Sequence, residues 1–319
     1  MTGHHTVSER ARDIALRTRT FVTESVIPYE STLSATAHGI QPDVRLVLQA
    51  LAKDAGIFAP TAPVEFGGLG LSHLEQSVVL EEAGRSLLGP TALNCAAPDE
   101  GNILLLDKVA TAGQRAGYLA PLARGEVRSA FAMTEPSPGA GADPDQLATH
   151  AQPVDGGWVI NGTKWFITGA TGAAFTIVMA RTGDAATMFL VDAANPGMRI
   201  ERQLDTLDSA FSGGHGHITF DDCKVSSGDV LGEVDKGFTY AQVRLAPARL
   251  THCMRWLGAA RRAHETAVAY AAARPMFSTV QSDLGMSQQM IADNEIDIAA
   301  SRALIWQAAA ALDTGSPAR

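Results

Sequence analysis

The chain changes its periodicity at Trp158-Val159-Ile160-Asn161-Gly162-Thr163-Lys164-Trp165-Phe166-Ile167-Thr168. Before this stretch the apolar residues recur at helical spacing, and within it the period changes to two, as in a strand with one buried face. An Asn-Gly pair between two such runs is the strongest short-range signal of a β-hairpin, because a type I′ turn needs positive φ at both central residues. The stretch therefore predicts a hairpin inside a β region.

The predicted β region extends on both sides of this hairpin and covers residues 129–232. Further short runs with strand character follow at residues 175–181, 187–191, 198–202 and 215–220. Several short strands of this kind predict a small β-barrel or sandwich.

Helical periodicity occupies both flanks of the β region. Residues 1–128 are predicted to form an N-terminal α-helical domain, with helices near residues 7–27, 45–55 and 72–88. Pro28 is expected to end the first helix. Residues 233–319 are predicted to form a partial C-terminal helical domain. The fold class is therefore α+β, in the order helical, β, helical.

The C-terminal region is predicted to contain two long helices, one from Gly237 and one over residues 281–312. Pro247 either opens the first helix or kinks it. A short connection favours an antiparallel pair, whose apolar faces are wide for two helices alone. Further structure is expected to cover them. Core candidates on the second helix are Met286, Met290, Ile291, Ile296, Ile298, Leu304 and Ile305.

Composition excludes several classes of protein. The 319 residues are 46% hydrophobic, enough for a large core divided into two or three regions. The net charge of −9 is spread without basic runs, which argues against nucleic-acid binding. No apolar stretch reaches the roughly 20 residues of a membrane helix, and the N-terminus lacks the apolar core of a signal peptide. We therefore expect a cytoplasmic protein with no membrane span.

The cysteines and paired histidines suggest neither a disulfide framework nor a metal site. Cys95, Cys223 and Cys253 are odd in number and widely spaced, and we expect all three to be buried small hydrophobes. His215 and His217 would point to one face of a strand. A solvent-facing or hydrogen-bonded pair is favoured over a metal site, because no third ligand lies near in sequence.

One glycine-rich stretch resembles a dinucleotide-binding loop at first sight. It is Pro63-Val64-Glu65-Phe66-Gly67-Gly68-Leu69-Gly70-Leu71-Ser72. No hydrophobic strand precedes it, and the G-x-G-x-x-G spacing is absent. A tight loop leading into a helix cap at Ser72 is predicted instead.

The order helical, β, helical is the layout of acyl-CoA dehydrogenases, and two segments make the resemblance specific. Phe131-Ala132-Met133-Thr134-Glu135-Pro136 resembles the family's flavin signature, and residues 161–168 resemble its second flavin segment. The family pattern also matches at three other places: the loop at residues 63–72, residues 235–238, and the pair Arg274 and Phe277. Residues 94–102 and 249–255 resemble the branch that in animals is fused to a kinase-like domain. The resemblance covers residues 21–315.

The resemblance implies an FAD site. The backbone is expected to lie along the flavin at Phe131, Ala132, Met133, Thr134, Phe166, Ile167 and Thr168. The Thr134 and Thr168 hydroxyls would bond the edge of the ring, and Phe166, where the family usually has Trp, would pack there. Taken alone, Thr134, Trp158 and Phe166 could instead be β-formers that fill a sheet core. The two segments together favour the flavin site.

The resemblance also implies phosphate, substrate and subunit contacts. Gly139 and Gly141 would let the backbone approach the cofactor phosphates or the thioester. Arg274, with Phe277 beside it, resembles the arginine that reaches the FAD pyrophosphate of a neighbouring subunit, which implies a homodimer or homotetramer. A surface arginine that caps the preceding helix is the alternative. Arg249 matches an arginine near the acyl-CoA entrance.

The implied reaction is the α,β-dehydrogenation of a fatty acyl-CoA to the trans-2-enoyl-CoA, as in fatty acid β-oxidation. A carboxylate removes the α-proton, hydride passes to the flavin, and electrons go on to an electron-transfer flavoprotein-type acceptor. The family's base lies either early in the first long helix, where Ala248 stands, or in a loop beyond the second. Alanine takes no proton, so we expect a truncated C-terminus and assign no catalytic residue.

Two alternatives to the dehydrogenase stay open. One is a flavin oxidase or monooxygenase on the same fold, in which the reduced flavin meets oxygen. The other is a non-catalytic fragment that binds flavin or acyl-CoA.

Overall fold

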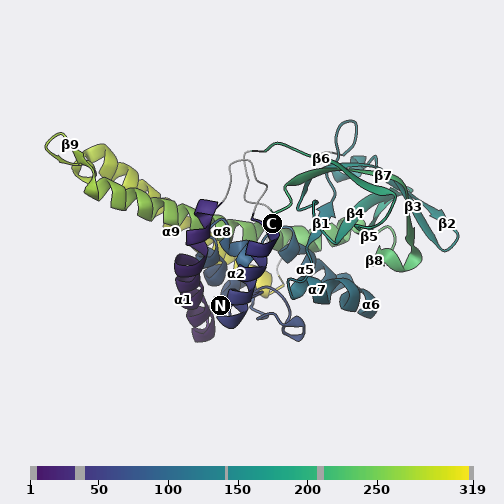
Figure 1. Cartoon of the computed structure of the whole chain (residues 1–319), viewed down its shortest axis with the longest axis horizontal. Coiled ribbons are helices and arrows are strands. Elements are labelled where there is room, and N and C mark those ends of the chain that lie inside the picture. Colours follow the sequence, from purple (N-terminus) through teal and green to yellow (C-terminus); the bar gives the residue numbers. More distant parts are fainter. Residues whose placement is uncertain (1–5, 33–39, 141–142, 207–211, 316–319) are drawn as a thin grey trace.

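The computed structural model describes residues 6–32, 40–140, 143–206 and 212–315, with helices at both ends of the chain and strands between them (Figure 1). The first helical region contains α1 (Glu9–Phe21), α2 (Pro42–Asp54), α3 (His73–Ala83), α4 (Gly89–Ala92), α5 (Asp99–Val109), α6 (Ala112–Gln114) and α7 (Ala120–Ala123). The β region contains β1 (Ser129–Ala132), β2 (His150–Val154), β3 (Gly157–Thr168), β4 (Phe175–Thr182), β5 (Ala185–Asp192), β6 (Met198–Gln203), β7 (His215–Ser226) and β8 (Val230–Leu231). The last region contains α8 (Gly237–Ala273), β9 (Pro275–Met276), β10 (Thr279–Val280) and α9 (Gly285–Asp313).

Two local predictions for the N-terminal helices have different outcomes. The first helix does not end at Pro28: α1 stops at Phe21, and a π-turn and a 3-10 turn containing the proline follow it. The tight loop before α3 is confirmed, because Ser72 caps α3 in a capping box with Glu75.

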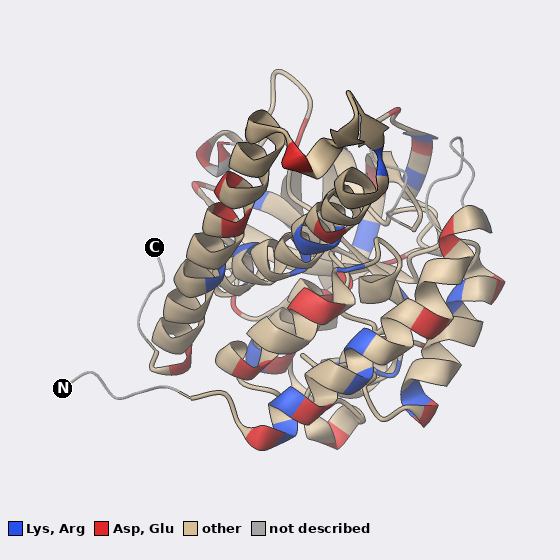
Figure 2. Cartoon of the chain, turned by 90° about the vertical axis from the view of Figure 1, so that its left-hand side faces the viewer, with Lys and Arg blue, Asp and Glu red and all other residues tan. Residues whose placement is uncertain are grey.

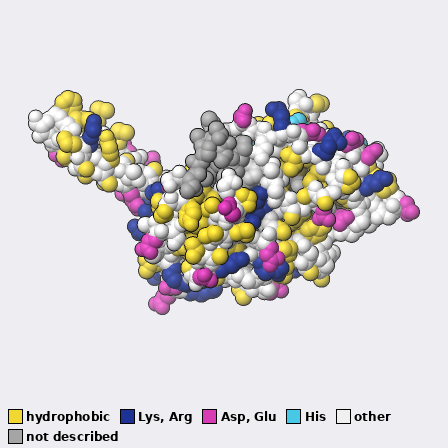
Figure 3. All heavy atoms as spheres, viewed as in Figure 1, with side chains coloured by type: hydrophobic (Ala, Val, Ile, Leu, Met, Phe, Trp, Pro, Cys, Tyr) yellow, Lys and Arg dark blue, Asp and Glu magenta, His cyan; other side chains and the backbone are white. Residues whose placement is uncertain are grey.

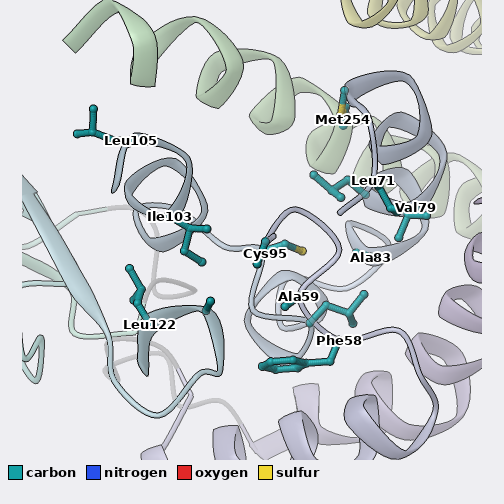
Figure 4. Packing of buried hydrophobic residues seen from close by; sticks show 14 of the residues in the cluster. Phe58, Ala59, Leu71, Val79, Ala83, Cys95, Ile103, Leu105, Leu122 and Met254 are labelled. Atoms are coloured by element: carbon teal, nitrogen blue, oxygen red, sulfur yellow. The ribbon is translucent and has the colours of Figure 1, made fainter. Parts of the chain in front are cut away.

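The helical region has a large hydrophobic core, part of which is drawn in Figure 4. Phe58 and Cys95 lie in this core, and Met254 reaches it from α8 to lie near Leu71 and Val79. Burial of these side chains holds α8 against the N-terminal helices. The C-terminal region is therefore part of the same packed body.

The strands form one eight-stranded sheet in the order β6-β7-β3-β2-β4-β5-β8, with β1 parallel to β4. β4 and β5 are buried on both faces. Ile177 and Met188 pack in the helical core, whereas Val178 and Phe189 belong to a second cluster formed by the sheet itself. Burial on both sides explains why these strands are apolar almost throughout.

The predicted Asn-Gly hairpin is wrong, because β3 runs through it as one continuous strand. The turn between β2 and β3 is Asp155-Gly156, another sequence typical of type I′ turns. Asn161-Gly162 lies instead at an irregularity in the pairing of β3 with β7. A Cβ on Gly162 would lie 2.5 Å from Cα of Thr149, so the glycine permits close approach of two backbones.

α8 and α9 form the predicted pair of long helices, and their outer halves project from the body as an arm that ends at β9 and β10 (Figure 1). Pro247 lies inside the 37 residues of α8, so it does not open the helix. α8 contacts β5, α5 and α3 before it enters the arm. One helix therefore runs from the sheet, past the helical region, to the arm.

α3 and α8 cross at two glycines. A Cβ on Gly84 would lie 1.9 Å from the backbone oxygen of Arg255, and a Cβ on Gly258 would lie 1.9 Å from that of Glu81. Backbone atoms therefore meet where these helices cross, and no side chain fits between them.

Ion pairs join α3, α8 and α9 at the root of the arm. The buried carboxylate of Glu81 accepts hydrogen bonds from Arg261 on α8 and Arg302 on α9, each at 2.7 Å. At the end of α9, the Asp313 carboxylate accepts a bond from the backbone N–H of His73 at the start of α3. The root is thus held at two places along α9.

Several buried positions predicted for the C-terminal region are exposed. Along the arm only part of α9 faces a neighbour, so Ile298 and Ile305 are buried whereas other core candidates face solvent; these are Met286, Met290, Ile296 and Leu304. Cys253 on α8 is exposed too, whereas Cys95 and Cys223 are buried as predicted.

Charged residues of both signs are interspersed over the helices, as Figure 2 shows. In the described parts of the chain, no helix combines the length and apolar character needed to cross a bilayer. Within the same residues, His, Cys, Asp and Glu side chains form no group of three or more that could hold a metal ion.

Candidate functional site

The two flavin-like segments lie side by side. The backbone N–H of Trp165 donates to the carbonyl oxygen of Thr134 at 3.0 Å, and Nζ of Lys164 donates to that of Met133 at 2.9 Å. Ala132 and Ile167 point into the core. The other predicted flavin residues are partly or largely exposed; they are Phe131, Met133, Thr134, Phe166 and Thr168.

Phe166 is held outward by a bulge in β3. The pairing of β3 with β7 shifts between Lys164 and Ile167, and Phe166 takes the left-handed φ of 52°. Its ring is 48% exposed and packs edge-on against Trp165, with the ring centroids 4.9 Å apart. Left-handed backbone at a bulky residue costs about 1–3 kcal/mol and is concentrated at ligand sites. The bulge thus presents a flat apolar surface.

A buried ion pair fixes the loop that follows β1. Nζ of Lys164 lies 2.8 Å from Oε1 of Glu135, and the two side chains are 0% and 1% exposed. The Glu135 carboxylate also accepts backbone N–H bonds from Ala140, Ala148 and Thr149. Burial would raise the pKa of Glu135, but Lys164 and these N–H groups outweigh it and hold that pKa at about 2. The loop is therefore organised around an ionised carboxylate.

Gly139 lies in this loop against the same carboxylate. A Cβ at Gly139 would lie 2.3 Å from Oε2 of Glu135, so the loop can close around the ion pair only with glycine there. Gly141, the other predicted glycine, lies outside the described residues.

A second buried network joins β1 to the helices. Oδ1 of Asp99 accepts bonds from the N–H and the hydroxyl of Ser129, and Asn102 donates to the same hydroxyl. Arg244 on α8 donates from Nε to Asn102 at 2.8 Å and lies over the Phe131 ring, 4.1 Å from its centroid. Burial lowers the pKa of Arg244 to about 10, so it remains charged near neutral pH. Helices α5 and α8 thus support Phe131 from behind.

Ala248, which stands at the family's helical base position, lies in this region. A Cβ on Gly101 would come within 3.4 Å of the Ala248 Cβ. A carboxylate lies close by: the Thr251 hydroxyl lies 2.7 Å from Oε1 of Glu100 and 3.0 Å from the carbonyl oxygen of Ala248. Burial would raise the pKa of Glu100, but Arg255, Thr251 and Arg244 together hold it below its ordinary value. Glu100 is therefore bound as an anion and is a poor proton acceptor.

The remaining predicted residues lie on α8 and at the tip of the arm. Arg249 is exposed on α8. Arg274 follows the last residue of α8, and Phe277 lies beyond it, 85% exposed, at the tip of the arm. Figure 1 shows that tip far from β1 and β3. Within one chain, the structure does not bring Arg274 and Phe277 to the flavin segments.

The sequence motifs alone do not identify Lys164, Arg244 or Asp99 as parts of the site. The available signal was charge in apolar surroundings, because Glu135 and Lys164 stand within the two flavin-like segments themselves. A charged residue in a buried strand requires a partner of opposite charge, and each segment supplies one.

Three family profiles match consecutive parts of the chain. They are described as the acyl-CoA dehydrogenase N-terminal domain over residues 8–126, the middle domain over residues 130–223 and the C-terminal domain over residues 235–319. These three profiles, in this order along the chain, define an oxidoreductase of the flavoprotein class.

Curated relatives specify the family. FadE2 of Mycobacterium tuberculosis, whose name describes an acyl-CoA dehydrogenase, is 36% identical over 96% of this chain and 78% of its own length. Acyl-CoA dehydrogenase family member 11 of Gallus gallus is 31% identical over 96% of this chain, and family member 10 of Mus musculus is 33% identical over 92%. The chain spans 41% and 29% of those two proteins. The chain belongs to the acyl-CoA dehydrogenase family, and members 10 and 11 confirm the predicted branch.

A solved structure confirms the predicted fold. Butyryl-CoA dehydrogenase of Megasphaera elsdenii superposes with a TM-score of 0.86 and 25% identity over 99% of this chain and 82% of its own. The α+β fold in the order helical, β, helical is thus the fold of this family.

Proposed function

We propose that this chain binds FAD and takes part in the α,β-dehydrogenation of an acyl-CoA thioester. One observation carries the proposal: a hydrogen bond from Trp165 to Thr134 joins the bulge of β3 to the segment after β1, with Phe166 exposed and Thr134 and Thr168 half-buried. An isoalloxazine ring needs this mixture of apolar surface, hydroxyls and backbone N–H groups. The residues present fit the group. When bound, FAD supplies the acceptor for the β-hydrogen, which leaves as hydride.

The residues of this chain have separate roles in the proposal. The backbone at residues 131–134 and 166–168 binds the ring, and Phe166 packs on it. The Glu135–Lys164 pair keeps the two segments in register, and Arg244 supports Phe131. Gly139 allows the loop to approach the cofactor phosphates. Preorganised contacts of this kind bind a cofactor without the cost of ordering a loop.

The proposal includes an oligomer and an electron acceptor. Arg274 lies at the arm tip, away from the flavin segments of its own chain, and a guanidinium suits the pyrophosphate of a neighbouring subunit. We assign this contact, with Phe277 beside it, to a second copy in a homodimer or homotetramer. The electrons pass to a flavoprotein acceptor of the electron-transfer type.

The test uses the full purified chain. Heat-released flavin is identified by chromatography, and the holoprotein is titrated anaerobically with acyl-CoA esters of increasing chain length. We expect FAD and bleaching of its visible absorption. Oxygen uptake with substrate would favour the oxidase, whereas bound FAD that no acyl-CoA bleaches would favour the non-catalytic alternative. A chain that neither contains nor binds FAD would refute the proposal.

The base position provides a gain-of-function prediction. Ala248→Glu places a carboxylate at the family's helical base position, where the wild-type side chain accepts no proton. Positioned acid–base catalysis contributes about 10²–10⁴-fold, so anaerobic bleaching should become at least about tenfold faster. Ala248→Gln is the matched control, because it has the same size but accepts no proton, and it should leave the rate unchanged. Equal rates in both variants would contradict the assignment of this position.

A further inference from the structure

The hydroxyl of Thr168 has a side-chain partner on the neighbouring strand. Its Oγ1 lies 3.0 Å from Nδ1 of His215, and the two residues are paired in the ladder between β3 and β7. Both side chains are half-buried. The histidine is thus adjacent to the predicted flavin edge.

The backbone of His215 is held on both sides. Its carbonyl oxygen accepts the N–H of Leu204 at 2.8 Å, while β3 lies on its other side. The imidazole therefore stands on a central strand of the sheet and has a defined position relative to Thr168. Groups on such strands hold their neighbours more accurately than groups on loops.

The hydrogen-bonding role of His215 determines the direction of the hydroxyl hydrogen of Thr168. A hydroxyl has one hydrogen to donate and lone pairs that accept, and a neutral imidazole carries its hydrogen on either nitrogen. If Nδ1–H donates to Oγ1, the Thr168 hydrogen is available for a ligand. If Nδ1 accepts instead, that hydrogen is occupied, and only a lone pair faces the ligand.

We propose that His215 is a positioning residue that donates from Nδ1 to Thr168 and so directs the threonine hydrogen at the flavin edge. The edge of an oxidised isoalloxazine presents two ring nitrogens and two carbonyl oxygens that accept hydrogen bonds, beside a single N–H at N3, so a donor suits most positions along it. His215 acts only through Thr168. This inference rests on the proposed function, because it requires a flavin along β3.

A double-mutant cycle tests the inference. FAD is titrated into the deflavinated full chain for wild type, His215→Phe, Thr168→Ala and the double variant, and the visible absorption of the bound flavin is recorded. Loss of one hydrogen bond of about 1 kcal/mol should raise the FAD dissociation constant about fivefold in His215→Phe and change the flavin spectrum. In the Thr168→Ala background the same change should have no further effect, because the group through which His215 acts is gone.

Two further variants separate positioning from packing. His215→Asn keeps an N–H near the position of Nδ1 and should restore most of the affinity. His217→Phe changes the next histidine of β7 and should leave affinity and spectrum as in wild type. Equal losses from His215→Phe in both backgrounds would overturn the inference and leave the proposed function standing. A wild-type chain that binds no FAD would overturn both.

Discussion

The Glu135–Lys164 pair buries one charge of each sign beside the proposed flavin edge. Removing two ions from water costs several kcal/mol, so such a pair adds little net stability compared with apolar side chains of the same size. The ion pair instead favours a single conformation of the chain around it. The carboxylate accepts backbone N–H bonds from Ala140, Ala148 and Thr149, and the ammonium donates to the carbonyl of Met133, so one arrangement satisfies all these groups.

The lowered pKa of Glu135 predicts a pH dependence of stability. Because its folded pKa of about 2 is below the ordinary 4.5, the unfolded chain takes up this proton first as pH falls. The contribution is complete above pH 4.5 and is lost toward pH 2, and it amounts to about 3 kcal/mol. Urea unfolding of wild type and Glu135→Gln should converge over this range. A stability difference that stays constant as the pH is lowered would contradict the prediction.

The sequence predicts only some of the residues in this site. Phe131, Thr134, Phe166 and Thr168 were predicted to share one site, and the structure brings their segments together. Lys164 is a charged residue in an apolar run, but the reason for its burial becomes evident only when Glu135, 29 residues earlier, is placed against it. The contact between His215 and Thr168 depends on the β3–β7 register, which no local signal specifies.

At the scale of elements, helices were easier to predict than strand connections. The long apolar periods of α8 and α9 located both helices, whereas the Asn-Gly pair predicted a turn inside β3. Asn161-Gly162 and Asp155-Gly156 are equally good turn sequences. The turn forms at Asp155-Gly156, whereas Gly162 lies inside β3, packed against the backbone of Thr149. The exposed candidates on α9 were misassigned for a different reason: periodicity shows which residues share a face and does not show whether another element covers it.

The crossing of α3 and α8 predicts a severe effect from a very small change. Gly258→Ala adds one methyl group 1.9 Å from the backbone oxygen of Glu81, so the helices must separate and the core between them must loosen. We expect a loss of at least about 2–3 kcal/mol in the free energy of unfolding by urea. Gly285→Ala is the control, since a Cβ there meets nothing within 4 Å and alanine favours helix. A neutral Gly258→Ala would show that the helices can move apart freely.

At the scale of the whole molecule, the arm exposes several large apolar side chains. Tyr270, Phe277, Met286 and Met290 are 58%, 85%, 81% and 64% exposed, and Figure 3 shows hydrophobic side chains along this part of the surface. Between α8 and α9 lies a groove of about 790 Å³, lined by residues such as Trp256 and Leu304. Exposed apolar surface of this kind marks interaction sites.

The arm predicts self-association through its exposed face. The double variant Met286→Asp and Met290→Asp places two charges there and should lower the mass measured by sedimentation velocity relative to wild type. Leu16→Asp is the matched control: it changes an apolar side chain of similar exposure, 65%, on α1 of the body, and should leave the mass unchanged. An unchanged mass in the arm variant, or a monomeric wild type, would contradict the prediction.

The continuity of α8 has a mechanical consequence. At 1.5 Å per residue, the part of α8 beyond the ion pair of Arg261, up to Ala273, is a rod of about 18 Å. On the body side of that pair α8 carries Arg244, which touches Phe131, and its far end carries the tip of the arm. A tilt of about 10° at Arg261 would swing that tip by about 3 Å, roughly the length of one hydrogen bond. A displacement that leaves the contacts at the root of the arm in place is thus large enough to make or lose a contact at the tip.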